Sequence, residues 1–234
     1  MKDNQHNANS SLPFGEGKES DDFSSSPGPS KKLSVLIIDN YDSFVYNLVH
    51  YLEELDGVVT VRRNNELELK EVEAYDKILL SPGPGIPDEA GLLKEIISTY
   101  ASKKSIFGVC LGQQAIGEVF GGKIINLKKV FHGVSSKITF CVNDEELYTN
   151  LDQGMEVGRY HSWVVDTALP DCLEATSYDE NGQIMSLRHR TFDVRGVQFH
   201  PESVLTPRGK EIIANWINMK PKDVEDKPVS KSGS

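Results

Sequence analysis

The sequence predicts an α/β protein with an open, mostly parallel sheet, helices on both faces, and an antiparallel portion added in the C-terminal half. Predominantly apolar runs, which are typical of strands buried on both faces, occur at residues 35–38, 77–80 and 105–109. Segments with apolar residues at helical spacing separate these runs. The last run ends at Cys110, which lies between two glycines in the spacing of a nucleophile elbow.

The first half of the chain alternates predicted strands and helices, which is the pattern of a parallel sheet. Residues 35–38 should form a strand, and an amphipathic helix should follow over residues 45–55 and end at Gly57. Further elements are expected in chain order at residues 58–61 (strand), 67–72 (short helix), 77–80 (strand) and 92–100 (helix). Binding sites in such sheets lie beyond the carboxyl ends of the strands.

Two loops follow predicted strands at this edge. The first covers residues 39–44, and the second, residues 81–87, has the sequence Ser-Pro-Gly-Pro-Gly-Ile-Pro. Proline and glycine at this density favour a rigid turn. Glycines also let backbone N–H groups approach a ligand or a developing oxyanion, so a binding role is the second interpretation of this loop.

Cys110 is expected to stand on a sharp turn between a buried strand and a helix. Its neighbours Gly108 and Gly112 let strand and helix approach each other and tolerate a strained backbone at the cysteine. The positive end of the helix dipole favours a thiolate at this position. The alternative, a small buried apolar residue, is the interpretation for Cys141 and Cys172, because neither has glycines at this spacing.

Beyond the elbow helix, which Gly121 and Gly122 end, the pattern changes to consecutive short strands. These strands are expected at residues 123–127, 136–141, 157–166, 173–178, 183–188 and 196–199. Strands without helices between them indicate antiparallel pairing. A last helix at residues 209–218 is predicted to place Trp216 in the core.

The composition limits the class of protein. The 234 residues carry a formal net charge of -10, which argues against a surface for nucleic acid or for an anionic membrane. Three cysteines without a paired framework fit a reducing compartment. No apolar run approaches the roughly 18 to 20 residues that span a bilayer, and the N-terminal residues lack an apolar signal segment. We therefore expect a soluble cytoplasmic protein.

One domain is expected, over residues 33–219. Residues 1–32 and 220–234 are rich in polar residues, glycine and proline, and they contain few apolar side chains. Such segments cannot bury enough surface to offset the entropy of ordering, so both are predicted to be disordered tails.

A histidine and a glutamate near the end of the chain are candidate partners of the cysteine. A strand is expected to bring His200 to its carboxyl end, where Pro201 prevents further strand pairing. Glu202 follows two residues after the imidazole, close enough to orient it. Cysteine catalysis needs a base that takes the thiol proton and an acidic group that orients the base. His200 and Glu202 are the candidates for these two roles.

The glycine loop, the elbow and the His200 turn form a set of three motifs. They read Gly83-Pro84-Gly85, Gly108-Val109-Cys110-Leu111-Gly112-Gln113-Gln114 and His200-Pro201-Glu202. Together they resemble the class I (triad-type) glutamine amidotransferase family, over a range from about Val35 to Ile217. Residues 39–44, 46–48, 159–163 and 188–190 are similar to the amidotransferase component (component II) of anthranilate synthase and para-aminobenzoate synthase.

This resemblance implies a mechanism and a set of site residues. Cys110 would attack the side-chain amide of L-glutamine, His200 would pass the thiol proton to the departing ammonia, and Glu202 would orient His200. Backbone N–H groups of Gly85 and Leu111 would hold the oxyanion. The residues implied to contact L-glutamine are Gly83, Pro84, Gly85, Gln114, Ser162 and Trp163. From the residues alone, Gln114 can also be an early helix residue and Trp163 a core residue.

The ammonia needs a consumer. The sequence shows no nucleotide-binding loop, metal cluster or second catalytic domain, so the resemblance implies a hetero-oligomer with a synthase subunit (component I) that binds chorismate and Mg²⁺. This chain itself is expected to need no cofactor and to bind no metal. His132-Gly133 resembles a family segment near the partner interface, but Val134 stands where the family usually has lysine.

The leading hypothesis is a subunit that hydrolyses L-glutamine through a cysteinyl thioester and supplies ammonia for anthranilate, in tryptophan biosynthesis. The same role in aminodeoxychorismate (para-aminobenzoate and folate) synthesis is the alternative. Residues 39–44 argue against an amidotransferase for a carbamoyl-phosphate or nucleotide synthetase. The intact Cys110, His200 and Glu202 argue against a non-catalytic regulatory subunit, and a thiol redox sensor should leave glutamine unhydrolysed.

Overall fold

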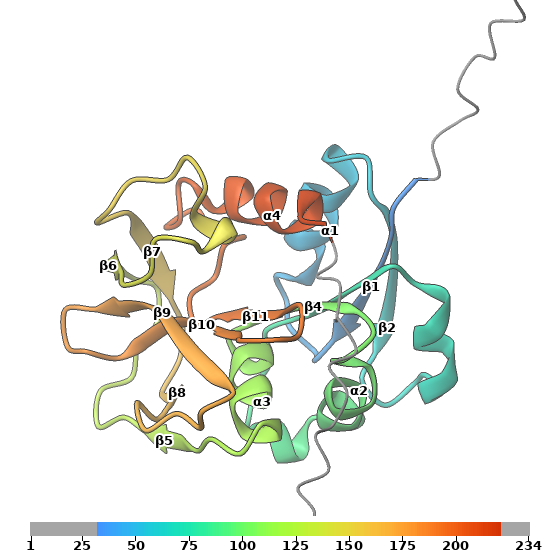
Figure 1. Cartoon of the computed structure of the whole chain (residues 1–234), viewed down its shortest axis with the longest axis horizontal. Helices are drawn as coiled ribbons and strands as arrows, with labels where there is room; N and C mark the ends of the chain where they lie inside the picture. The colour runs from blue at the N-terminus through green and yellow to red at the C-terminus, as the bar shows by residue number, and fades with distance from the viewer. Residues whose placement is uncertain (1–31, 221–234) are drawn as a thin grey trace, which may run out of the picture. The chain divides into compact units, whose positions relative to one another are not determined.

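The computed structural model describes residues 32–220 (Figure 1). The two predicted tails, residues 1–32 and 220–234, lie outside the described residues apart from Lys32 and Lys220. Over the described range, no helix combines the length and the apolar character that crossing a membrane requires.

A mixed sheet of nine strands runs through the described residues, in the order β2-β1-β3-β4-β11-β10-β9-β6-β7. Its parallel part consists of β2 (Val58–Arg63), β1 (Ser34–Asp39), β3 (Lys77–Leu80), β4 (Ser105–Val109) and β11 (Val194–Val197). Every residue of β3, β4 and β11 is buried, as expected for strands covered on both faces. The predicted parallel sheet is confirmed in this half.

The antiparallel part continues the same sheet from β11. It consists of β10 (Ile184–His189), β9 (Leu173–Asp179), β6 (Val134–Phe140) and β7 (Glu156–Arg159). Two further strands, β5 (Ile124–Asn126) and β8 (Trp163–Val165), form a separate antiparallel pair. The predicted antiparallel addition is therefore confirmed, with one pair of strands outside the main sheet.

Two predicted strands differ from the observed ones. The single strand expected over residues 157–166 is divided into β7 and β8, because the carbonyl groups of His161 and Ser162 bond to a neighbouring loop instead of continuing the ladder. The strand expected over residues 196–199 is β11, which ends at Val197 because the chain then crosses over to bond with β7.

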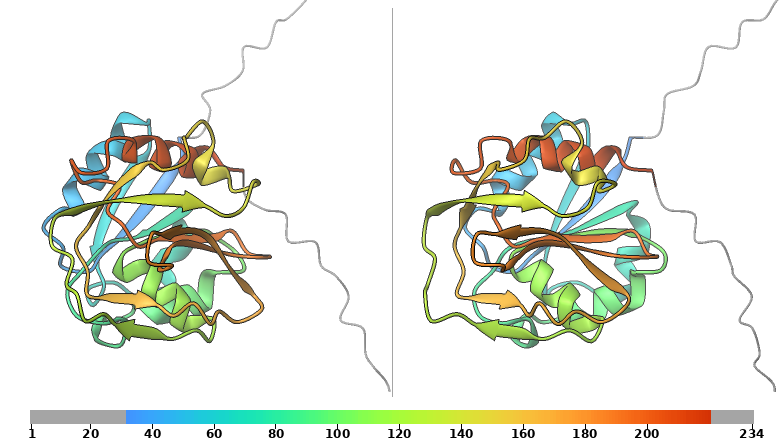
Figure 2. Two further views of the ribbon diagram at one scale, coloured as in Figure 1. Left: turned by 90° about the vertical axis from the view of Figure 1, so that its left-hand side faces the viewer. Right: turned by 60° about the vertical axis from the view of Figure 1, so that its left-hand side comes forward.

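Helices cover both faces of the parallel part, as predicted. One face carries α1 (Val45–Glu54) and α4 (Gly209–Asn218), and the other carries α2 (Leu93–Tyr100) and α3 (Leu111–Val119) (Figures 1 and 2). Alternate residues of β1 contribute to the two apolar layers between sheet and helices. The described elements also include the 3₁₀ helices η1 (Leu69–Ala74), η2 (Pro87–Glu89) and η3 (Glu146–Tyr148). The first of these takes the place of the short helix expected over residues 67–72.

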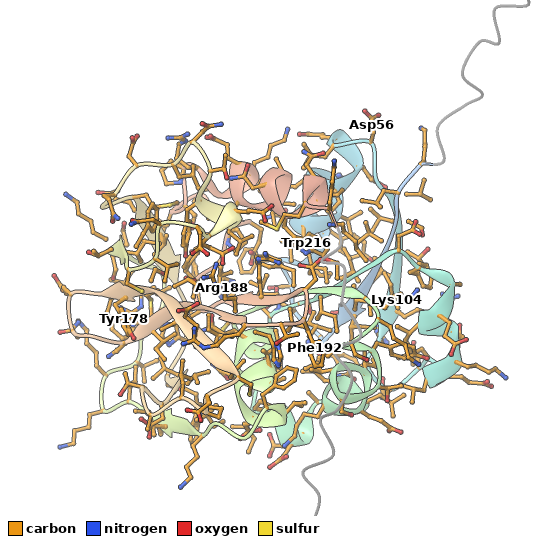
Figure 3. All side chains as sticks on the ribbon, in the orientation of Figure 1. Asp56, Lys104, Tyr178, Arg188, Phe192 and Trp216 are labelled. Atoms are coloured by element: carbon orange, nitrogen blue, oxygen red, sulfur yellow. The ribbon has the colours of Figure 1, made fainter. Side chains whose placement is uncertain are left out.

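Trp216 of α4 occupies the core position that the sequence predicts. Its side chain is fully buried and stacks on Phe107 of β4, with ring centroids 5.4 Å apart. Figure 3 shows it between α4 and the sheet. The buried Nζ of Lys77 donates hydrogen bonds to the carbonyl oxygens of Trp216 and Met219, at 2.8 and 3.0 Å. These bonds pair the buried ammonium group with carbonyl groups at the C-terminal end of α4, where a helix favours a cation.

The sheet brings the predicted loops to one edge. Because β1, β3 and β4 are parallel neighbours, the loops at residues 39–44 and 81–87 and the elbow at Cys110 all follow strand ends at that edge. The Cys110 N–H donates to the carbonyl oxygen of Val197 at 2.8 Å, so the end of β11 meets the elbow there.

Candidate active site

Cys110 is the turn residue between β4 and α3. Its backbone has φ 52° and ψ -99°, an uncommon conformation for a residue with a side chain. A β-carbon at Gly108 would lie 2.5 Å from the Gly112 carbonyl carbon, and one at Gly112 would lie 2.6 Å from the Leu80 carbonyl oxygen. Both positions therefore require glycine because backbones approach closely, and the predicted elbow is present.

His200 and Glu202 lie beside this elbow. Nδ1 of His200 is 2.7 Å from Oε1 of Glu202, and both side chains are buried. Burial alone would lower the pKa of His200, but hydrogen bonding to Cys110 and Glu202, together with their charges, raises that pKa well above its ordinary value. Nδ1 of the ring is thus engaged by Glu202, and the buried Nε2, which has no hydrogen-bond partner among the described residues, is left for the nearby sulfur of Cys110.

The backbone around His200 is held by contacts from other elements. Its N–H donates to the carbonyl oxygen of Gly158 in β7 at 2.9 Å, and its own carbonyl oxygen accepts from the Thr206 hydroxyl at 2.6 Å. The ring of Tyr160 meets the imidazole edge-on, with centroids 4.9 Å apart. These contacts leave the imidazole little freedom to turn away from the cysteine.

A pocket of about 140 Å³ opens beside Cys110. It is lined by Gly83, Pro84, Gly85, Cys110, Gln114, Tyr160, His161, Ser162 and Trp163. All the residues predicted to contact L-glutamine are in this set. The structure thus brings together residues from the loop after β3, from α3, from the segment between β7 and β8 and from the start of β8, and their role in binding stays a prediction.

A wider cavity of about 350 Å³ adjoins the first and also reaches Cys110. Its lining comes from Tyr41, Asp42, Ser43, Phe44, Pro82, Gly83, Pro84, Cys110, His132, Tyr160 and His200. The loop at residues 39–44 therefore forms one wall of the entrance. Burial raises the pKa of Asp42 in this wall above its ordinary value, and the nearby charge of His200 opposes that rise.

The two predicted oxyanion donors both belong to segments next to Cys110 or its pocket. Leu111 is the first residue of α3, where backbone N–H groups have no acceptor within the helix. Gly85 has a positive φ of 77° and lines the small pocket. Their role as donors to an anion that forms next to the sulfur stays a prediction.

The side-chain NH₂ group of Gln114 donates hydrogen bonds to other groups of the protein. Its Nε2 donates to the carbonyl oxygen of Trp163 at 2.9 Å and to Oε1 of Gln198 at 3.4 Å. Both amide hydrogens are thereby engaged, so a contact between this side chain and glutamine would have to use its oxygen.

The segment between β7 and β8 is fixed by a buried cation. Arg159 donates to Asp179 at 2.6 Å, to Nε2 of His161 at 3.1 Å and to Gln183, and its guanidinium lies 3.5 Å from the ring centroid of Phe131. Burial, followed by the charge of Arg159, lowers the pKa of His161 to about 3. His161 is therefore neutral where it lines the pocket.

Sequence reasoning missed several residues of the site. Gln198 contacts the cysteine sulfur, and Tyr160 and His161 line the pocket beside two predicted residues. The signal for Gln198 is its place two residues before His200 at the end of a strand, where alternate side chains share a side. No local pattern marks Asp179 as the partner of Arg159, because the pairing joins two strands that are distant in sequence.

Comparison with known proteins decides the family. The family model described as glutamine amidotransferase class-I matches residues 36–219. The chain belongs to this family. This amidotransferase is 46% identical over 187 residues to aminodeoxychorismate synthase component 2 of Escherichia coli (strain K12), covering 79% of this chain and 99% of that protein. It is also 46% identical over 191 residues to anthranilate synthase component 2 of Pseudomonas aeruginosa, covering 78% and 94%.

Two further proteins are similar to this chain, one in sequence and one in structure. The amidotransferase is 44% identical over 210 residues to the bifunctional protein TrpGD of Thermotoga maritima, which covers 88% of this chain and 35% of that protein. A putative GMP synthase subunit from Thermoplasma acidophilum has a similar structure, with a TM-score of 0.72 at 25% identity, over 80% of this chain and 92% of the other. These similarities support an amidotransferase role and leave the product of the synthase undecided between anthranilate and aminodeoxychorismate.

Proposed function

We propose that this chain hydrolyses L-glutamine through a thioester on Cys110 and delivers the ammonia to a chorismate-using synthase subunit that makes anthranilate. The observation that carries the proposal is the meeting of Cys110, His200 and Glu202 at a pocket lined by all the predicted glutamine contacts. The equal identity to an aminodeoxychorismate synthase component keeps aminodeoxychorismate as the second candidate product.

In the proposed reaction, the Cys110 thiol gives its proton to His200, and the thiolate attacks the amide carbon of the glutamine side chain. The C–N bond then breaks as His200 returns the proton to the nitrogen, which leaves as ammonia. A water molecule deprotonated by His200 cleaves the thioester, so that glutamate and the free thiol are released. Glu202 holds the imidazole and stabilises its protonated form.

The tetrahedral intermediate carries a negative charge that needs donors. The N–H group of Leu111, at the start of α3, and that of Gly85, in the wall of the pocket, are proposed to bind this oxyanion. A donor of this kind typically lowers the barrier by roughly 3 to 4 kcal/mol.

The exposed residues at the cavity entrance are suited to contact with a partner subunit. Tyr41, Phe44 and Tyr46 of the loop at residues 39–44 and the start of α1 are 50%, 45% and 65% exposed. Exposed aromatic side chains grouped beside a site are typical of protein interfaces. A synthase subunit seated there, with chorismate and Mg²⁺ on its own side, would receive ammonia directly from the cavity.

Substitution of the nucleophile tests the proposal. In a complex with the co-purified synthase subunit, Cys110→Ser should abolish product formation from chorismate and glutamine and should leave formation from chorismate and ammonium salts intact. Cys141→Ser is the control, because Cys141, which the sequence wrongly predicted to be buried, is exposed and lies outside the pocket. Glutamine use that survives Cys110→Ser would overturn the nucleophile assignment.

The same complex decides the product. Anthranilate is expected when the wild-type complex is given chorismate and glutamine, and it is identified by chromatography and mass. Aminodeoxychorismate as the product would move the chain to the second candidate. A chain with no glutaminase activity in the complex would instead be a regulatory subunit.

A further inference from the structure

We propose that Gln198 is a further catalytic residue: its side-chain amide donates a hydrogen bond to the sulfur of Cys110 and stabilises the thiolate that attacks glutamine. The inference rests on the proposed function, since it takes Cys110 as the nucleophile. It adds a neutral donor to the charged one that His200 supplies.

The contact itself is direct. Nε2 of Gln198 lies 3.5 Å from Sγ of Cys110, and the Gln198 side chain is fully buried. Cys110 is 6% exposed, so water solvates a thiolate poorly at this position. A buried anion without donors is strongly disfavoured, and a hydrogen bond to a charged group contributes more than one between neutral groups. The amide of Gln198 therefore replaces solvation that burial removes.

The direction of this hydrogen bond follows from a chain of contacts that begins at a carbonyl group. The Trp163 carbonyl oxygen can only accept, so the amide group of Gln114 that lies 2.9 Å away is its NH₂. The other hydrogen of this NH₂ faces Gln198 at 3.4 Å, so Gln198 presents its oxygen there. The NH₂ of Gln198 is left to face the sulfur.

The backbone holds Gln198 in this position. Its N–H donates to the Met185 carbonyl oxygen in β10, and the Cys110 N–H donates to the carbonyl oxygen of the preceding residue, Val197, both at 2.8 Å. Gln198 and His200 are alternate residues of the same segment, so both side chains can reach the sulfur. One segment thus supplies the proton acceptor and the neutral donor.

The chain of amides also joins the nucleophile to the pocket wall. Trp163, at its start, lines the glutamine pocket, and Gln114 and Gln198 carry the contact to Cys110. Because the donor and the acceptor of each hydrogen bond in this chain are fixed, Gln198 can only donate to the sulfur and cannot take its proton. Proton transfer stays with His200.

The test measures the thiolate directly, without turnover. The rate at which iodoacetamide alkylates Cys110 is followed against pH in the isolated full-length chain, with the labelled peptide identified by mass spectrometry. Gln198→Met keeps the length of the side chain and removes the donor. We expect alkylation at neutral pH to slow by about tenfold, and the pH midpoint of the alkylation rate to rise by about one unit.

The matched control is Gln113→Met. Gln113 is also a fully buried glutamine next to the elbow, and neither of its amide atoms has a hydrogen-bond partner among the described residues. The same substitution there should leave the pH midpoint of Cys110 alkylation unchanged. If Gln113→Met shifted the midpoint as much as Gln198→Met, the effect would be general repacking and the proposal would fail.

A second variant, Gln198→Glu, tests the proposal if Gln198→Met does not fold. Gln198→Glu keeps the acceptor for Gln114 and places a carboxylate that cannot donate against the sulfur, so alkylation should be slower still. Wild-type alkylation rates in either folded variant would overturn the role of Gln198. Wild-type Cys110 that resists alkylation while glutamine is hydrolysed would overturn the proposed function instead.

Discussion

A cysteine, a histidine and a glutamate, all buried, are brought together at the carboxyl edge of the sheet. The bond between Glu202 and Nδ1 of His200, 2.7 Å long, fixes which nitrogen of the ring remains for Cys110. The pKa of His200 is raised because a neighbouring sulfur and carboxylate outweigh the effect of burial. This arrangement suits an imidazole that must hold a proton between two steps of a reaction.

The roles of base and orienter can be separated by two substitutions. His200→Ala removes the base, and turnover of glutamine should fall by roughly 10²- to 10⁴-fold. Glu202→Gln keeps the base and weakens its orientation, so the fall in kcat should be smaller. Steady-state glutaminase assays of both variants provide the measurement, and equal losses would argue against the orienting role.

His161 should make the protein acid-sensitive. Its pKa is lowered from 6.5 to about 3 in the folded state, mainly by burial and then by Arg159, so between these values the unfolded chain binds a proton that the folded chain does not. Protonation then favours unfolding, and stability is lost as pH falls from 6.5 toward 3. The contribution of this group is roughly 1.4 kcal/mol per pH unit in that window.

The variant His161→Gln isolates this effect. Glutamine can still accept from Arg159 but does not titrate, so its free energy of unfolding should fall less steeply than that of the wild type as pH decreases. Urea unfolding at several values between pH 6.5 and pH 4 measures both slopes. Identical slopes would show that His161 is not the titrating group.

Among the elements, α3 is the one whose position the sequence restricts most. It begins directly after Cys110 and packs with Ala115 and Ile116 against the sheet face that carries α2. Gly112 lets its first turn approach β3, and that approach sets where the first N–H groups of the helix point. The elbow is thus a consequence of backbone packing between one helix and two strands.

Gly112→Ala should disturb this element. The added methyl would lie 2.6 Å from the Leu80 carbonyl oxygen, a contact that only a backbone shift can relieve. We expect a loss of roughly 1 to 3 kcal/mol in the free energy of unfolding, typical of overpacking, together with reduced glutamine hydrolysis. Denaturant unfolding measures the loss of stability. The control is Thr99→Ala on the exposed side of α2, and the free energy of unfolding of this variant should change little. Wild-type stability in Gly112→Ala would show that the elbow tolerates a side chain.

Over the whole described domain, the parallel and antiparallel halves are joined between β4 and β10 by β11. This strand pairs parallel with β4 and antiparallel with β10, so one short segment carries both kinds of ladder. It also leads into Gln198 and His200. Any change that moves β11 would therefore alter the sheet and the site together.

Trp216 links the last helix to the centre of this sheet. Removal of its side chain in Trp216→Ala leaves a cavity against Phe107, and the expected loss of stability is roughly 3 to 5 kcal/mol. Urea unfolding monitored by circular dichroism measures the loss. The control is Val204→Ala, whose side chain is 93% exposed, and a Trp216→Ala protein as stable as this control would contradict the core position.

Local patterns were enough for much of the fold. The apolar runs of β1, β3 and β4, the helical spacing of α1 to α4 and the glycines around Cys110 each depend on neighbours within a few residues, and all of these elements form where the sequence predicts them. The prediction of a single strand over residues 157–166 was wrong for the opposite reason. Its interruption depends on hydrogen bonds from a loop some thirty residues earlier in the chain, at residues 127–131.

The features of the site also divide into those that local motifs predict and those that only the structure reveals. Cys110, His200 and Glu202 are recognisable because each stands in a short motif with its own turn chemistry. The contact of Gln198 with the sulfur, the pairing of Arg159 with Asp179 and the neutral state of His161 became visible only in three dimensions. The physical reason is that hydrogen-bond direction and burial depend on atoms from strands and helices far apart in sequence, and only packing brings those atoms into contact.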